Sequence, residues 1–183
     1  MNKIEDGILY KTKCYEIGSI EHGNGRSWRE HVTEELSQLG IICYDPFKKP
    51  FIKDTDETEE YQKDLVRWRE NGEFDKLSKH MRKIRNHDLA LVDKCDFIIC
   101  HLNIKTPTCG TFEELFTANR AKKVIFLSCE QGVKSLYTWL FGTLNHHYFY
   151  NSVDEIIDMI KKINSGECEV DSDRWKLLKP CFR

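Results

Sequence analysis

The sequence predicts a single α/β domain in which helices cover both faces of a parallel β-sheet. Short apolar segments alternate along the chain with longer segments whose apolar residues recur at helical spacing. One short segment, "DFIICHL" at 96–102, is almost continuously apolar, which is typical of a strand buried on both faces. The length of 183 residues suits one domain of ordinary size.

The first half of the domain is expected to contain two strands, one helix and an insertion. The segment "KCYEIGSI" at 13–20 predicts a strand that runs into a Gly-Ser turn. The segment at 27–40 predicts a helix with Ser27 as its N-cap, and "IICYDP" at 41–46 predicts the second strand. Residues 47–74 are strongly charged and break the alternation, so we expect an insertion with one or two exposed helices there.

The second half continues the alternation and completes the sheet. The predicted elements are, in chain order, a helix at 80–95, a strand at 96–102, a helix at 110–121, a strand at 123–129, a helix at 135–144, a short strand at 146–150 and an amphipathic helix at 152–164 capped by Ser152. Five strands alternating with helices predict a flavodoxin-like, doubly wound sheet of about five parallel strands with right-handed crossovers. A polar tail follows from about 166 to 183.

Composition narrows the classes of protein that the chain can represent. Hydrophobic residues make up 40% and charged residues 32%, which allows a packed core and argues against disorder. The formal net charge of -2 argues against binding of nucleic acid through bulk electrostatics. The 8 cysteines form no CxxC pair and several lie in apolar runs, which favours buried, reduced thiols over disulfides or a zinc site.

The chain shows no pattern of export or membrane insertion. Its first residues, "MNKIEDGILYK", lack the apolar core of a signal peptide. No apolar run approaches the roughly 18 residues needed to span a bilayer. We therefore expect a cytoplasmic protein without a membrane partner.

Ligands of doubly wound sheets bind at the carboxyl ends of the strands, which directs attention to the turns that follow them. The first turn carries Gly18 and Ser19, but it lacks the GxGxxG pattern of dinucleotide-binding folds. The turn after 96–102 leads into a helix with two glutamates, Glu113 and Glu114. Glu114 has the T-x-x-E spacing of a capping box with Thr111, and it also lies on the helix side that faces the sheet. Capping and catalysis thus compete for this carboxylate.

Three motifs together resemble the nucleoside 2-deoxyribosyltransferase family, including its relatives that hydrolyse 2'-deoxynucleoside 5'-monophosphates. "YEIGSI" is similar to the family's turn after the first strand. "HDLALVDKCDFIIC" is similar to its Asp-Leu segment followed by an Ala-Asp-type strand, and "TPTCGTFEELFTANRAKKVIFL" to its Gly-Thr-x-x-Glu helix and the strand beyond. In this order they cover most of residues 12–130.

The resemblance implies an enzyme that cleaves or transfers an N-glycosidic bond without a cofactor or metal. Its nucleophile would be Glu114, oriented by Tyr15, while Asp88 would contact the sugar or base and help proton transfer to the leaving base. Small-molecule partners would be a nucleoside or nucleotide and a free nucleobase, and the resemblance implies a homo-oligomer. The residues implied to line the sugar or phosphate end are Gly18, Ser19, Ile20, Thr108 and Gly110.

Departures from the family pattern leave the substrate open. Thr108 stands where the monophosphate hydrolases have a hydroxyl residue, whereas transferases often place an acidic residue next to this position. Glu21 would repel a phosphate unless Arg26 or Arg29 compensates its charge. Two other functions fit the same fold, namely a non-catalytic nucleotide-sensing module and a nucleosidase acting on a dinucleotide such as NAD.

Two weaker signals lie near the C-terminus. His146 and His147 are adjacent on a predicted strand, where their side chains would point to opposite faces, and no third metal ligand accompanies them. Aromatic residues in the same region could form plain core or a surface on which a base stacks, and the resemblance implies that a neighbouring subunit could contribute such a surface. They are Trp139, Phe141, Tyr148 and Phe149.

Overall fold

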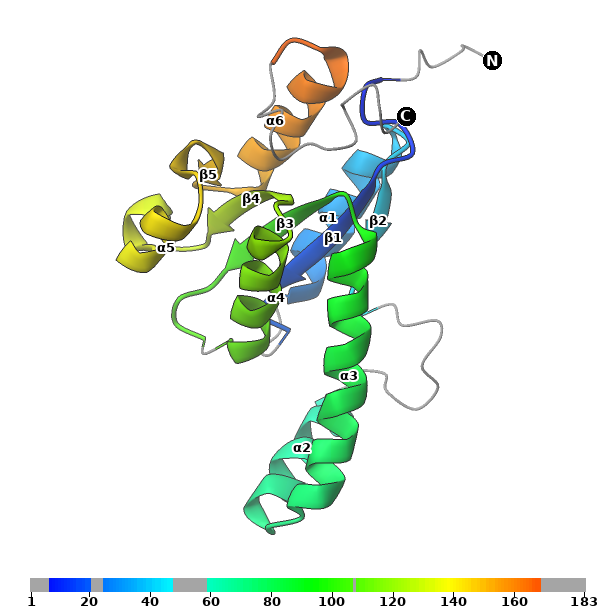
Figure 1. The fold of residues 1–183 in the computed structure, drawn as a ribbon, viewed down its shortest axis with the longest axis vertical. Coiled ribbons are helices and arrows are strands. Elements are labelled where there is room, and N and C mark those ends of the chain that lie inside the picture. Colours follow the sequence, from blue (N-terminus) through cyan, green and yellow to red (C-terminus); the bar gives the residue numbers. More distant parts are fainter. Residues whose placement is uncertain (1–6, 21–24, 48–58, 107, 169–183) are drawn as a thin grey trace.

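The computed structural model describes residues 7–20, 25–47, 59–106 and 108–168, with residues 59 and 60 described by their backbone alone. Within them, five parallel strands form one sheet in the order β2-β1-β3-β4-β5 (Figure 1). The predicted doubly wound α/β fold is therefore confirmed. The strands are β1 (Lys13–Gly18), β2 (Ile42–Tyr44), β3 (Phe97–Leu102), β4 (Val124–Cys129) and β5 (Phe149–Tyr150).

Helices cover both faces of this sheet. Helices α1 and α6 pack on one face, and α3, α4 and α5 pack on the other (Figure 1). The helices are α1 (Gly25–Ser37), α2 (Glu59–Glu70), α3 (Phe74–Lys94), α4 (Cys109–Arg120), α5 (Thr138–Thr143) and α6 (Val153–Ser165), and two short 3₁₀ helices lie at Val133–Ser135 and His146–Tyr148.

Alternation of side chains along the strands divides the core into two clusters. Cys14 of β1 and Phe97 of β3 face α1 and α6, whereas Tyr15 and Ile98, one residue further along, face α3 and α4. This follows from the two-residue period of a strand, and both faces are apolar because helices cover both. The strand order reverses between β1 and β3, so the carboxyl ends of these two strands form the place where such folds bind ligands.

Two helix caps and one strand test the local predictions. Ser152 caps α6 as predicted, because its Oγ accepts a hydrogen bond from the Glu155 amide at 3.2 Å. Ser27 is not an N-cap, since α1 already begins at Gly25. The predicted strand at 146–150 is wrong in its first three residues, which form a 3₁₀ helix. Asn145 is the N-cap of this helix, and its side chain accepts a hydrogen bond from the His147 amide. Only the last two residues pair with β4.

The predicted insertion contains α2 and the start of α3, which leave the sheet together as a helical arm (Figure 1). The first residue of α3 that is buried is Ile84, so the arm consists of α2 and residues 74–83 of α3. Its own small core is formed around Trp68, which is 6% exposed. The Trp68 ring packs against His80 with a centroid distance of 4.8 Å, and the Lys76 Nζ lies 4.3 Å from the Trp68 ring centroid. Residues 48–58 and the tail from 169 to 183 lie outside the described residues.

Among the described residues, no helix is both long enough and apolar enough to cross a membrane.

Candidate active site

Tyr15 of β1 and Glu114 of α4 meet on the face of the sheet that α3 and α4 cover, where α4 follows the carboxyl end of β3. The Tyr15 hydroxyl donates a hydrogen bond of 2.8 Å to Glu114 Oε1, although the two residues are 99 positions apart in the chain. The predicted capping box is wrong, because α4 begins at Cys109 and Thr108 occupies the N-cap position. Thr111 lies inside the helix and is buried. The Glu114 carboxylate is therefore held toward Tyr15.

The two glutamates of α4 are separated by the helix geometry, as the sequence predicts. Glu114 lies three residues after Thr111 and four before Ala118, both of which are buried, so it belongs to the side that faces the sheet. Glu113 turns outward and accepts a two-pronged hydrogen bond from the Arg85 guanidinium of α3. This exposed pair bridges α3 and α4 and leaves only one of the glutamates at the strand ends.

The surroundings of Tyr15 keep its phenol protonated. Burial raises the pKa of Tyr15 well above its ordinary value, and the nearby charges of Glu114 and Asp88 raise it further. A phenol in this state donates a hydrogen bond at neutral pH and does not compete as a second anion. Tyr15 can therefore orient the Glu114 carboxylate through the whole neutral range.

Asp88 reaches the same region from α3. It lies on the buried side of the helix with Ile84 and Leu91 and is 9% exposed. Its charge is close enough to raise the pKa of Tyr15. The three residues implied as catalytic therefore come together, with Tyr15 joined to Glu114 by a hydrogen bond and to Asp88 by electrostatics.

The turn after β1 is built around a buried arginine, which the sequence reasoning considered only as a counter-charge for a phosphate. Arg29 of α1 is 0% exposed. Its Nε donates to the Glu16 carbonyl at 3.2 Å, and its Nη2 donates to the Gly18 carbonyl at 3.0 Å. Its Nη1 donates to the carbonyls of Ser19 and Gly25. These bonds hold the turn in place, and Glu21, the charge that Arg29 was expected to offset, lies outside the described residues.

The position of Arg29 in its helix accounts for its burial. The residue lies three positions before Val32 and seven before Leu36, so it belongs to the buried stripe of α1. That spacing is visible in the sequence, but a charged residue is usually assigned to the solvent side. The other arginine considered, Arg26, is exposed, and its guanidinium lies 4.6 Å from the centroid of the Phe47 ring.

The glycines implied to contact substrate have different environments. A Cβ atom at Gly18 would lie 2.6 Å from the carbonyl oxygen of His101 on β3, so packing against the sheet requires glycine there. At Gly110, in the first turn of α4, a Cβ atom would meet nothing within 4 Å. The half-buried Thr108 precedes this turn, and the half-buried Ile20 lies two residues after β1. Gly110 therefore borders open space at the strand ends.

Glu16 is a second buried charged group that the sequence reasoning missed. It lies on β1 beneath α1, is 0% exposed and accepts a hydrogen bond of 3.1 Å from Thr33 on Oε1. Its Oε2 is buried without a hydrogen-bond partner. Burial raises the pKa of Glu16 to about 8, with a smaller contribution from the charge of Asp45. The signal in the sequence is a glutamate between Tyr15 and Ile17, inside the buried part of a strand.

The described residues contain no group of three His, Cys, Asp or Glu side chains that could hold a metal ion. The His146 and His147 rings do not point to opposite faces, because the 3₁₀ helix places their centroids 4.2 Å apart. Two of the four aromatic residues in this region are not core, since Trp139 is 78% and Phe141 47% exposed.

Comparison with known proteins supports the fold. No family model and no curated protein sequence matches the chain. Among solved structures, it is similar to a 2-deoxyribosyltransferase from the psychrotolerant bacterium Bacillus psychrosaccharolyticus, with a TM-score of 0.57 and 12% sequence identity over 80% of this chain and 91% of the other. The chain has the fold of a 2-deoxyribosyltransferase. The resemblance inferred from the motifs is thus confirmed at the level of the fold.

A second similar structure is the CMP N-glycosidase of Clostridium botulinum, with a TM-score of 0.49 and 15% identity over 82% of this chain and 98% of the other. On the 2-deoxyribosyltransferase fold, Tyr15 occupies the first strand, and Glu114 the helix that follows the third. Any conclusion about chemistry depends on the side chains that the fold brings together there.

Proposed function

We propose that the chain cleaves or transfers the N-glycosidic bond of a 2'-deoxynucleoside or its 5'-monophosphate through a covalent intermediate on Glu114. The observation that carries the proposal is the 2.8 Å hydrogen bond from Tyr15 to Glu114 at the ligand-binding end of a 2-deoxyribosyltransferase fold. A carboxylate fixed by a neutral phenol is oriented for attack on a sugar carbon. Helix capping does not explain this contact.

In the first step, a Glu114 oxygen attacks C1' of the deoxyribose. The bond between C1' and the base nitrogen breaks, and its electron pair stays with the base. Asp88 takes up a proton in the substrate complex and passes it to that base, so the leaving group departs neutral and Asp88 is left as a carboxylate. Tyr15 keeps its proton throughout and donates its hydrogen bond to the carboxyl group. The product of this step is a glycosyl ester on Glu114.

In the second step, an acceptor attacks C1' from the opposite side and the bond to Glu114 breaks. A water molecule as acceptor gives a hydrolase, and a free nucleobase gives a transferase. In both cases the acceptor's proton passes to Asp88, which restores the starting state. Two displacements at the same carbon retain the anomeric configuration.

The substrate-contacting role is assigned to the two turns at the strand ends. Gly18, Ser19 and Ile20 follow β1, while Thr108 and Gly110 stand at the start of α4. The open space beside Gly110 suits a sugar or phosphate that approaches the helix backbone. Arg29 donates hydrogen bonds to the carbonyls of Gly18 and Ser19, so this part of the site is held in place before substrate binds.

The experiment is a panel of 2'-deoxynucleosides and their 5'-monophosphates, each with and without a free acceptor base, followed by chromatography for base release or exchange. Glu114→Ala is expected to abolish turnover. Glu113→Ala, which removes the neighbouring carboxylate that pairs with Arg85, is the matched control and should keep it.

Intact mass spectrometry after acid quenching should detect a glycosyl adduct on the wild-type chain and none on Glu114→Ala. Full turnover by Glu114→Ala would disprove the nucleophile. Release of no base from any substrate would disprove the activity and favour a nucleotide-sensing module instead.

A further inference from the structure

We propose that His87 is a positioning residue that holds the Asp88 carboxyl group in the orientation needed at the Tyr15–Glu114 pair. This inference rests on the proposed function, in which Asp88 moves a proton to and from the substrate. The contact that carries it joins His87 Nδ1 to Asp88 Oδ1 at 3.2 Å.

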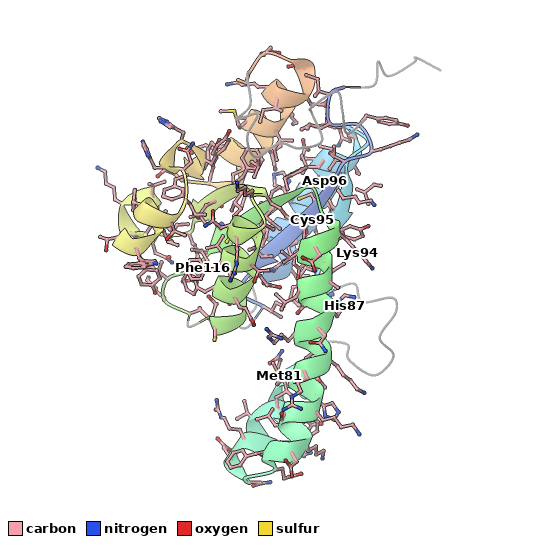
Figure 2. The ribbon with its side chains drawn as sticks, in the orientation of Figure 1. Met81, His87, Lys94, Cys95, Asp96 and Phe116 are labelled. Atoms are coloured by element: carbon pink, nitrogen blue, oxygen red, sulfur yellow. The ribbon has the colours of Figure 1, made fainter. Side chains whose placement is uncertain are left out.

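The helix geometry explains why two consecutive residues both face inward. His87 lies three residues after Ile84 and four before Leu91, and Asp88 lies four after Ile84 and three before Leu91. The two polar residues therefore share the middle of an apolar stripe. Figure 2 places His87 on α3 between Met81 of the arm and Lys94 at the end of the helix.

Burial makes the His87–Asp88 contact more consequential than a surface pair. The side chains of His87 and Asp88 are only 15% and 12% exposed. A hydrogen bond to a carboxylate in partly desolvated surroundings is stronger than one in water, and it restricts rotation of the carboxyl group. The pair His31–Asp154 is a surface counterpart. Its His31 Nε2 and Asp154 Oδ1 atoms are closer, at 2.8 Å, but its side chains are 48% and 77% exposed.

Orientation of Asp88 has a direct chemical consequence under the proposed mechanism. Proton transfer to a leaving base needs the carboxyl oxygen within hydrogen-bond reach of the base, and a displacement of about 1 Å can lower a rate on the order of 100-fold. The charge of Asp88 already acts on Tyr15, so a rotated carboxyl group would also alter the surroundings of the nucleophile. A donor that fixes Asp88 therefore contributes to kcat more than to binding.

Substitution of His87 by Asn or by Gln tests the two imidazole nitrogens one at a time, because each amide nitrogen stands in for a different ring nitrogen. In His87→Asn the amide nitrogen replaces Nδ1, which contacts Asp88, and in His87→Gln it replaces Nε2, which does not. Both variants remain polar at a partly buried site. Base release should show that His87→Asn keeps kcat within about threefold, while His87→Gln loses about tenfold or more with KM changed less than threefold. The control variant His31→Gln should match the wild type.

A double-mutant cycle then tests whether His87 acts through Asp88. If it does, His87→Gln lowers kcat in the wild-type background and causes no further loss in an Asp88→Asn background. Thermal unfolding of each variant separates a loss of positioning from a loss of folded protein. Equal kcat values for His87→Asn and His87→Gln, whether high or low, would overturn the inference, as would independent losses in the cycle. An inactive wild type would overturn the proposed function, and the positioning role with it.

Discussion

The buried carboxyl group of Glu16 makes the stability of the fold depend on pH. Glu16 is fully enclosed by the sheet and α1, with one oxygen bonded to Thr33 and the other without a partner. We predict that replacing it with glutamine flattens this dependence. Glutamine has nearly the same shape as a protonated glutamate and cannot lose a proton.

The magnitude follows from the difference between the folded and unfolded pKa. Burial raises the pKa of Glu16 from its ordinary value of 4.5 to about 8. Between these values the folded chain holds a proton that the unfolded chain has lost, so the free energy of unfolding falls as the pH rises. The full loss is about 5 kcal/mol above pH 8, and about 3 kcal/mol of it is reached by pH 7, at roughly 1.4 kcal/mol for each unit of pKa.

Urea unfolding at several pH values between 5 and 9 measures this effect. The wild type should lose stability relative to Glu16→Gln across that interval, and the two curves should run parallel only above about pH 8. Glu35→Gln is the control, because Glu35 is a partly exposed glutamate of α1, the helix that covers Glu16, and its hydrogen bond to Lys161 lowers its pKa. That variant should keep the wild-type slope. Parallel curves for wild type and Glu16→Gln between pH 5 and 8 would refute the reasoning.

Three further predictions test the site and the arm. Tyr15→Phe should lower kcat for base release by about tenfold to 100-fold, because it removes a hydrogen bond to the Glu114 carboxylate worth about 1.5–3 kcal/mol. Gly18→Ala should destabilise the fold by about 2 kcal/mol or more in urea unfolding, since its Cβ meets the backbone of β3, whereas Gly110→Ala should gain up to about 1 kcal/mol. Trp68→Ala should speed hydrogen exchange in α2 while leaving the exchange of the strands unchanged.

Each of these expectations has a result that contradicts it. Wild-type turnover by Tyr15→Phe would show that the phenol does not orient the nucleophile. Equal effects of alanine at Gly18 and Gly110 on stability would show that the close approach of β1 to β3 does not exclude a side chain at position 18. Faster exchange in β1 or β3 after Trp68→Ala would show that the arm and the sheet unfold as one unit.

The sequence predicts the architecture well because periodicity reports which side of an element is buried. Val124–Cys129 is buried throughout and apolar except for Ser128, because helices cover both sides of its sheet. Val153–Ser165 repeats isoleucines on one side because only that side packs. The separation of Glu113 from Glu114 follows in the same way from 100° of rotation per helical residue.

What the sequence does not predict depends on contacts between distant segments. T-x-x-E at Thr111 has the spacing of a capping box, but the preceding residues extend the helix, and Tyr15 draws the glutamate away. "HHYFY" is rich in the aromatic residues that strands favour, but the Asn145 side chain accepts from the His147 amide and its first three residues form a 3₁₀ helix. Arg29 is charged and yet buried because it donates to four carbonyls, three of them from Glu16, Gly18 and Ser19 at the end of β1 and one from Gly25 in its own helix.

A rigid α3 would act as a lever about Ile84, its first buried residue. The tip of the helix at Phe74 lies ten residues to one side of Ile84, and Asp88 lies four residues to the other. At 1.5 Å per residue these two stretches of helix measure about 15 Å and about 6 Å. A sideways push of about 5 Å at the tip would therefore carry Asp88 through about 2 Å. In such a rigid motion, a displacement at the tip of the arm would reach Asp88 reduced to less than half its size.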